Sequence, residues 1–179
     1  MKTKNSVFIA TSLDGFIADK DEGIDWLEMI PNPQQDDMGA IAFFKQVDAM
    51  IMGRNTFETV LGFGVDWPYP FPVFVLSNSM KNPPKGYENK IQILNGPLKE
   101  VLGKIHNQGH HSIYIDGSTV IQNFLKEDLI DELIVTRIPI LLGGGISLFG
   151  DMSNSLEFEH VKTEVYLDQI VQSNYRRKL

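Results

Sequence analysis

Short apolar segments alternate with amphipathic segments over most of the chain, and this alternation constrains the fold more than any other feature. Runs rich in strand-forming residues are separated by stretches in which apolar residues recur at helical spacing. Strands that alternate with helices pair in parallel, because each helical crossover returns the chain to the same end of the sheet. The predicted strands are 7–10, 49–52, 71–76, 91–94, 112–116 and 133–138, and the predicted helices are 36–47, 55–61, 97–107 and 118–125.

The pattern changes after the glycine triplet at 143–145. Residues 156–166 and 170–177 predict two long strands joined by a tight turn near 167–169. This hairpin would add antiparallel strands to the parallel ones, so we expect a mixed sheet. The chain has 179 residues without repeats or a linker, which predicts a single domain over 1–179. The sequence therefore predicts an α/β fold.

The composition argues against several classes of function. The net charge is −7, whereas proteins that bind nucleic acid usually carry clustered Lys and Arg. The absence of cysteine removes disulfides, thiolate chemistry and cysteine-based zinc sites, and the histidines are not grouped with acids as metal ligands are. No apolar run approaches the ~20 residues that span a membrane. We expect a soluble, cytoplasmic protein that binds no metal, nucleic acid or membrane.

Four segments in a fixed order carry the functional signal. They are SLDGFIA at 12–18, MGRNTFET at 52–59, IDGS at 115–118 and PILLGGGISLF at 139–149. In this order they resemble the dihydrofolate reductase-like superfamily, and most closely the branch that includes the reductase domain of bacterial riboflavin biosynthesis. The resemblance covers nearly the whole chain. It implies a dihydrofolate reductase-like three-layer fold, with a mixed, mostly parallel central sheet flanked by helices, and it implies NADPH as cofactor.

The segment Gly53-Arg54-Asn55-Thr56 joins a predicted strand to a predicted helix. A helix start offers free backbone N–H groups and the positive end of the helix dipole, which suit a phosphate. Arg54 adds a permanent cation and Thr56 a hydroxyl donor. The alternative is that Asn55 caps the helix and Arg54 is solvated. The resemblance favours phosphates at the adenosine end of NADPH.

A second strand-to-helix junction lies at 116–120. Gly117 lets the backbone approach a ligand closely, while Ser118, Thr119 and Val120 present N–H groups. The resembled family usually has two adjacent glycines here, whereas this chain has Asp116-Gly117. A carboxylate beside a pyrophosphate is electrostatically unfavourable, so we expect Asp116 to point away from the cofactor or to cap the helix.

Further cofactor contacts follow from the resemblance. It places Ser77, and Leu76 before it, near the adenosine 2′-phosphate; a polar strand end is the alternative. It places the nicotinamide against Ala10 and against the glycine-rich backbone, where the contacts are Leu142, Gly143 and Gly144. A glycine triplet also permits a sharp bulge between strands, and both interpretations remain open.

Two carboxylates are predicted proton sources. Asp14 follows the first strand, in a loop that covers the nicotinamide in the resembled family; its alternative role is to cap the turn before Gly15. Dihydrofolate reductases carry a carboxylate on the first helix, and the position counted from Phe44 holds Ala40 here. Asp36 lies one helical turn before Ala40, which makes it the second candidate. An acid there could also simply stabilise the helix start.

The predicted substrate pocket lies between the first-strand loop, the Trp26 region and the first helix. Its candidate residues are Ser12, Trp26, Ala40 and Phe44. Trp26 could stack on a planar ring, or it could belong to the core or to a dimer interface.

The overall prediction is an NADPH-dependent reductase that transfers a hydride to a small heterocyclic substrate, pteridine- or pyrimidine-like. The alternatives are a dedicated 5-amino-6-(5-phosphoribosylamino)uracil reductase of the riboflavin pathway, a dihydrofolate reductase, and a non-catalytic nucleotide-binding dimeric scaffold. The C-terminal hairpin could pair across a two-fold axis, which allows a homodimer.

Overall fold

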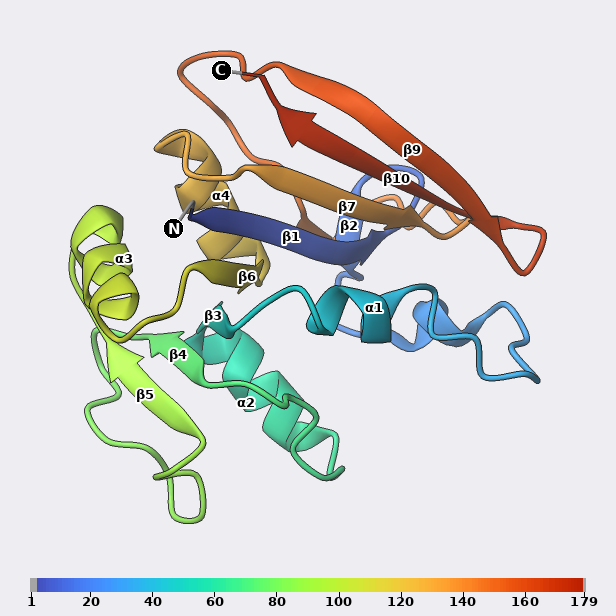
Figure 1. The fold of residues 1–179 in the computed structure, drawn as a ribbon. Helices are drawn as coiled ribbons and strands as arrows, with labels where there is room; N and C mark the ends of the chain where they lie inside the picture. The colour runs from blue at the N-terminus through green and yellow to red at the C-terminus, as the bar shows by residue number, and fades with distance from the viewer. Residues whose placement is uncertain (1–2, 179) are drawn as a thin grey trace.

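A computed structural model describes residues 3–178 and shows a central eight-stranded sheet with helices packed against both of its faces (Figure 1). The strands are β1 (Lys4–Thr11), β2 (Phe16–Ala18), β3 (Ala49–Gly53), β4 (Val73–Leu76), β5 (Ile91–Leu94), β6 (Ser112–Asp116), β7 (Glu132–Arg137), β8 (Ile146–Ser147), β9 (Phe158–Tyr166) and β10 (Ile170–Arg177). The helices are the 3-10 turn η1 (Asp25–Glu28), α1 (Ala40–Phe44), α2 (Arg54–Gly62), α3 (Leu98–Asn107) and α4 (Ser118–Lys126).

The strand order in the large sheet is β5-β4-β3-β6-β1-β7-β10-β9. The strands from β5 to β7 pair in parallel, while β10 is antiparallel to both β7 and β9. Strands β2 and β8 form a separate antiparallel pair. The predicted α/β fold with a mixed sheet and a C-terminal hairpin is confirmed.

Two hydrophobic layers cover the sheet, and alternation along the strands divides the side chains between them. Ile51 of β3 joins the layer formed with α3 and α4, whereas Met50 and Met52 join the layer formed with α1 and α2. Phe124 of α4 and Phe57 of α2, both without solvent exposure, lie at the centres of these layers. Helices α2 and α4 therefore leave the neighbouring strands β3 and β6 toward opposite faces.

The predicted helix over 36–47 is wrong in its first part, because α1 begins only at Ala40. Gln35, Met38 and Gly39 have positive φ angles of 52°, 50° and 83°, which no right-handed helix accommodates. The carboxylate of Asp37 instead accepts the N–H of Ile41 at 2.6 Å and so stabilises the helix start from outside. Asp36 and Asp37 therefore lie in a turn before the helix and not on a face of it.

The hairpin β9–β10 forms the edge of the sheet. Most residues of β9 are exposed, and Val161 and Val165 are 44% and 61% exposed. Figure 1 shows β9 as the outermost strand, with neither a further strand nor a helix covering it. The homodimer inferred from the sequence stays a prediction.

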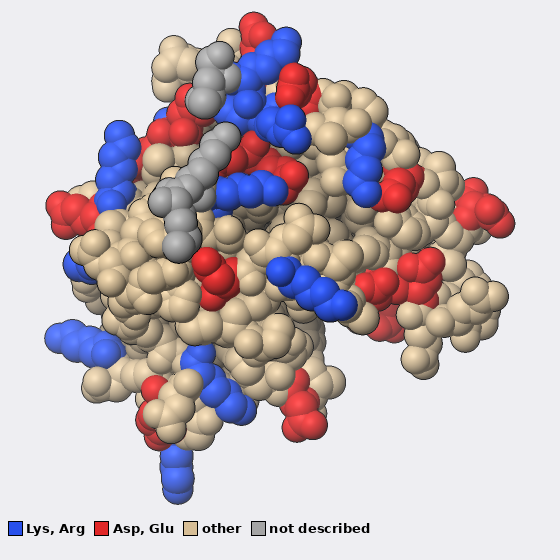
Figure 2. Space-filling model, viewed as in Figure 1, with Lys and Arg blue, Asp and Glu red and all other residues tan. Residues whose placement is uncertain are grey.

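Acidic and basic side chains are interspersed on the face shown in Figure 2, without a large area of a single sign. Over residues 3–178, none of the helices combines the length and the apolar character that crossing a membrane requires.

Candidate active site

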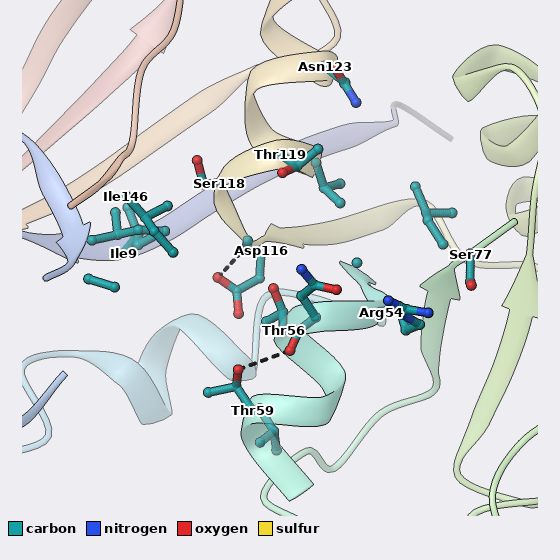
Figure 3. Close-up of a pocket in the computed structure, with 18 of the residues that line it drawn as sticks. Ile9, Arg54, Thr56, Thr59, Ser77, Asp116, Ser118, Thr119, Asn123 and Ile146 are labelled. Carbon is teal, nitrogen blue, oxygen red and sulfur yellow. Dashed lines mark hydrogen bonds between the residues drawn. The ribbon is translucent and has the colours of Figure 1, made fainter. Parts of the chain in front are cut away.

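A cavity of about 870 Å³ opens at the carboxyl ends of the parallel strands (Figure 3). Its lining includes Ala10 of β1, Gly53 of β3, Leu76 of β4 and Asp116 of β6. Because β3 and β6 are neighbours whose helices leave toward opposite faces, a crevice forms between the two helix starts. This is the point of an open α/β sheet at which ligands generally bind.

The first turns of α2 and α4 meet across the crevice. A Cβ atom built on Gly53 would lie 3.3 Å from Cγ2 of Val120, and one built on Gly117 would collide with Oγ1 of Thr56. Neither helix has a hydrogen bond from a capping side chain, so the N–H groups of both first turns are available at the cavity. Two helix starts in this arrangement fit the diphosphate of a dinucleotide.

Arg54 lies at one end of the cavity with two serines. Its Nη1 donates to Oγ of Ser79 at 2.9 Å, and the backbone N–H of Ser79 donates to Oγ of Ser77 at 3.2 Å. Nε of Arg54 lies 3.5 Å from a carboxylate oxygen of Glu58. Both side chains are about half exposed, so this ion pair adds little stability. A guanidinium with adjacent hydroxyl groups fits a phosphate monoester.

Asp116 lies in the cavity wall between the two helix starts. Its Oδ1 accepts the N–H of Gly117 at 2.8 Å, and the expectation that Asp116 turns away from a cofactor stays a prediction. Burial raises the pKa of Asp116 to about 6, partly offset by the Gly117 N–H. Burial also raises the pKa of Tyr69 and of Tyr114, and the nearby Asp116 charge raises both further.

Asp14 does not line the cavity. Its carboxylate accepts the Ser12 hydroxyl at 2.6 Å and the backbone N–H groups of Gly143 and Leu142 at 2.7 and 3.1 Å. These bonds, the one from Ser12 foremost, lower the pKa of Asp14. The residue ties the loop after β1 to the glycine triplet, and a carboxyl with a lowered pKa is a poor proton donor near neutral pH.

Asp36 also lies outside the cavity. It is exposed, and its Oδ1 accepts the N–H of Met38 at 2.8 Å, while its own N–H donates to Asn32 at 2.8 Å. Glu22 and Asp116 are the carboxylates among the lining residues.

Most of the predicted cofactor contacts come together at the cavity. Those that line it are Ala10, Gly53, Arg54, Asn55, Thr56, Leu76, Ser77, Asp116, Gly117, Ser118, Thr119 and Val120. Leu142, Gly143 and Gly144 do not. The triplet forms a tight turn with φ angles of 70°, 154° and 135°, and a Cβ on Gly145 would collide with the carbonyl oxygen of Ala18. Ala18 itself lines the cavity, so the triplet lies behind the wall.

The predicted substrate residues do not line the cavity. Trp26 is 8% exposed and packs in a small core with Ile138 and Ile170, while its Nε1–H donates to the Gly23 carbonyl at 3.2 Å. Ser12, Ala40 and Phe44 are likewise absent from the lining. Larger side chains that do line it include Ile24, Leu27, Val60, Phe63 and Tyr69.

Sequence reasoning missed several lining residues. Ser79, Asn95, Gly96 and Asn123 face the cavity from loops and from α4. The repeat of serine at 77 and 79 was a usable signal for Ser79, whereas nothing local marks the other three. Within residues 3–178, no three His, Asp or Glu side chains are grouped so that they could bind a metal ion.

Comparison with known proteins places the chain in a family. The model of the RibD C-terminal domain matches residues 6–172. The uncharacterized protein YwjB of Bacillus subtilis is 33% identical over 180 residues, covering 99% of each chain.

Solved structures show the same fold. A protein from Shewanella sp. PV-4, provisionally assigned to riboflavin biosynthesis, is 53% identical with a TM-score of 0.96, covering 98% of this chain and 99% of that one. A dihydrofolate reductase from Enterococcus faecalis, solved with NADP(H), is 18% identical with a TM-score of 0.63, covering 97% and 96%. The chain therefore belongs to the RibD C-terminal domain family and has a dihydrofolate reductase-like fold.

Proposed function

We propose that the chain is an NADPH-dependent reductase that transfers a hydride to a small heterocyclic substrate. One observation carries the proposal: two uncapped helix starts and the Arg54 cluster open onto the same cavity. Helix starts without a capping side chain favour a bound anion, and a guanidinium flanked by hydroxyl groups favours a second one. Membership of the RibD C-terminal domain family supports the same activity.

Different residues would bind different parts of the cofactor. The N–H groups at the starts of α2 and α4 would hold the diphosphate, and Arg54 with Ser77 and Ser79 would hold the 2′-phosphate. Bound NADPH supplies the hydride. The chain contributes alignment of the substrate and exclusion of water, to which the apolar side chains of Ile9 and Ile146 at the cavity contribute.

The structure bears differently on the alternatives. A dihydrofolate reductase is disfavoured, because α1 has Ala40 where the acid is expected and Asp36 lies on an exposed turn. A dedicated reductase of the riboflavin pathway shares the cofactor half of the cavity and differs in the substrate that it accepts. A non-catalytic scaffold is separated from both by direct measurement of cofactor binding and turnover.

The proposal is tested by isothermal titration of the full chain with NADPH and with NADH. We expect NADPH to bind more tightly than about 1 mM and more tightly than NADH. Arg54→Ala should weaken NADPH roughly 10- to 100-fold, which is the usual effect of losing a charge-assisted hydrogen bond, and should affect NADH less. Oxidation of NADPH in a screen of nitrogen heterocycles then reports turnover.

The control is Lys85→Ala, which removes a positive charge from an exposed position outside the cavity lining. Its NADPH affinity should stay within about twofold of the parent, as expected for a screened surface charge. Failure of both nucleotides to bind would refute the reductase. Equal losses of NADPH and NADH in Arg54→Ala would refute the contact with the 2′-phosphate.

A further inference from the structure

The large sheet has two edge strands of very different length. Strand β5 spans four residues, Ile91–Leu94, whereas β9 spans nine, Phe158–Tyr166. Strand β9 pairs with β10 along one edge, and over residues 3–178 no strand pairs with its other edge (Figure 1). A long free edge presents backbone N–H and C=O groups that a further strand can bind.

The side chains of β9 alternate between the two faces of the sheet. Lys162 and Glu164 share one face, where Nζ of Lys162 lies 2.6 Å from a carboxylate oxygen of Glu164. Thr163 and Val165 lie on the other face. Val161 and Val165 are both exposed, so a partner strand that covered them would remove apolar area from water.

A two-fold axis through Thr163 makes this edge complementary to itself. In an antiparallel pair of β9 strands centred there, Lys162 lies directly opposite Glu164 of the partner subunit, and Val161 lies opposite Val165 of the partner subunit. The axis repeats each contact, so four charges alternate in sign between two pairs of valines. Opposite charges and β-branched side chains stabilise antiparallel strands when they lie directly across from each other.

The neighbouring registers lack this complementarity. An axis through Lys162 places that lysine opposite its own copy, and an axis through Glu164 does the same for the glutamate. Like charges directly across from each other destabilise a strand pair. An axis between two residues would pair side chains on opposite faces, which the alternation along a strand does not allow. The register centred on Thr163 is therefore the favoured one.

A β-bulge limits the length of this pairing. The register between β9 and β10 shifts between Asn174 and Tyr175, which leaves Val161 as an extra residue of β9. A bulge bends its strand and interrupts further pairing along it. The contact is therefore short, and we expect a reversible association with a Kd in roughly the micromolar range.

We propose that β9 is an interface at which two copies of the chain pair antiparallel about Thr163, so that their eight-stranded sheets join into one. The partner is a second copy because the charges of this edge match the edge itself. An isologous contact of this kind closes after two copies and gives a dimer. No residue of β9 lines the cavity, so the inference does not depend on the proposed reductase activity.

The first test is sedimentation velocity of the full chain over a concentration series, which should show a reversible equilibrium between monomer and dimer. Lys162→Glu creates two pairs of like charges across the axis and should raise the Kd roughly 10- to 100-fold, as should Glu164→Lys. The double variant restores both charge pairs and should return the Kd to within about threefold of the parent. Lys99→Glu, a charge reversal at an exposed residue of α3, is the control and should change it less than about twofold.

The second test uses the absence of cysteine from the chain, because a single introduced thiol then reports the register. The proposed axis brings the two Thr163 Cα atoms to roughly 4.5–5.5 Å, a distance that a disulfide spans. Thr163→Cys should therefore form a covalent dimer on mild oxidation, as seen by non-reducing electrophoresis. Ser153→Cys, in an exposed loop before β9, is the matched control and should stay mostly monomeric.

Three results would overturn the inference. The first is a chain that remains monomeric at about 500 µM, well above the expected Kd. The second is a dimer whose Kd neither single charge reversal changes, which would assign the contact to another surface. The third is equal cross-linking of Thr163→Cys and Ser153→Cys, which would show that Thr163 does not lie at the axis.

Discussion

Oγ1 of Thr56 occupies the space into which a side chain at Gly117 would project. Thr56 belongs to the first turn of α2 and Gly117 is the residue before α4, so this contact joins the two helix starts. Gly117 has a φ of 88°, a region that L side chains rarely adopt. Both the contact and the backbone conformation thus require glycine where the cofactor phosphates are expected.

Gly117→Ala should destabilise the protein by roughly 2–4 kcal/mol, because backbone strain and overpacking add. It should also weaken NADPH binding, since the collision pushes the starts of α2 and α4 apart. Urea unfolding and titration calorimetry measure the two effects. Removing the hydroxyl with Thr56→Ala in the same chain should recover about 1 kcal/mol of the loss.

The matched control is Gly86→Ala. Gly86 has a φ of 89°, but a Cβ there would meet no atom within 4 Å. Gly86→Ala should lower the free energy of unfolding by about 1 kcal/mol, which is the cost of the strained backbone conformation without a collision. If the two alanine variants were equally stable, the contact with Thr56 would have no energetic role.

Asp116→Asn should change the pH dependence of stability. The folded-state pKa of Asp116 is raised from 3.8 to about 6, so the fold favours the protonated form. Its contribution is therefore fully present below pH 3.8 and is lost as the pH rises through 6. An amide at position 116 cannot ionise, so the variant does not lose this stability as the pH rises. The free energy of unfolding of the variant minus that of the parent should therefore increase by up to roughly 3 kcal/mol between pH 4 and pH 8.

Chemical denaturation at several pH values checks this expectation. A constant difference between the variant and the parent over that range would show that the carboxyl ionises in the fold as it does in the unfolded chain.

Asp14→Asn should loosen the loop after β1. Its lowered pKa means that the carboxylate stabilises the fold above pH 3.8, and that this contribution is lost as the pH falls. An amide keeps one acceptor oxygen and cannot replace all three bonds to Ser12, Leu142 and Gly143. We expect a lower melting temperature at pH 7 and faster hydrogen exchange at the amides of Leu142 and Gly143.

At pH 3 the melting temperatures of Asp14→Asn and the parent should converge. Asp151→Asn serves as control and should leave both measurements unchanged, because Asp151 is exposed and its side chain has no ion-pair partner within residues 3–178. Slow exchange at Gly143 in the Asp14 variant would show that the loop is held by other contacts.

The glycine triplet should tolerate substitution unequally. A Cβ on Gly145 would collide with the carbonyl oxygen of Ala18, whereas one on Gly143 would meet nothing within 4 Å. Gly145→Ala should therefore cost roughly 3 kcal/mol and Gly143→Ala about 1 kcal/mol. Thermal unfolding measures both variants. A lower melting temperature for Gly145→Ala than for Gly143→Ala indicates a tight turn behind the cavity wall, whereas equal melting temperatures indicate a flexible stretch.

The architecture was predictable from the sequence because its signals are local. Strand β3 is an uninterrupted apolar run, and α4 has apolar residues at helical spacing, so each segment has one compatible structure. Helix α1 was not predictable in its full extent. The apolar spacing from Met38 onward resembles a helix, but the left-handed residues before Ala40 depend on hydrogen bonds within the turn that spacing does not reveal.

One part of the candidate site was likewise predictable from the sequence and the other part was not. The strand-to-helix junctions that line the cavity, such as Gly53–Thr56, could be predicted, since each follows directly from a local change of sequence pattern. The substrate half could not, because its wall comes from side chains of separate loops. Trp26 and Leu27 are adjacent in sequence, yet η1 turns the first into the core and the second toward the cavity. The inward or outward direction of such a short turn depends on tertiary packing.

The contact between the two helix starts separates the site into parts that can change at different rates during evolution. The proposed cofactor half is made largely of main chain at two helix starts, which glycines allow to lie close together. The opposite half is made of loop side chains, which can be exchanged without disturbing the sheet. A lineage built on this plan can acquire a new substrate by altering a few loop residues while it keeps the same cofactor.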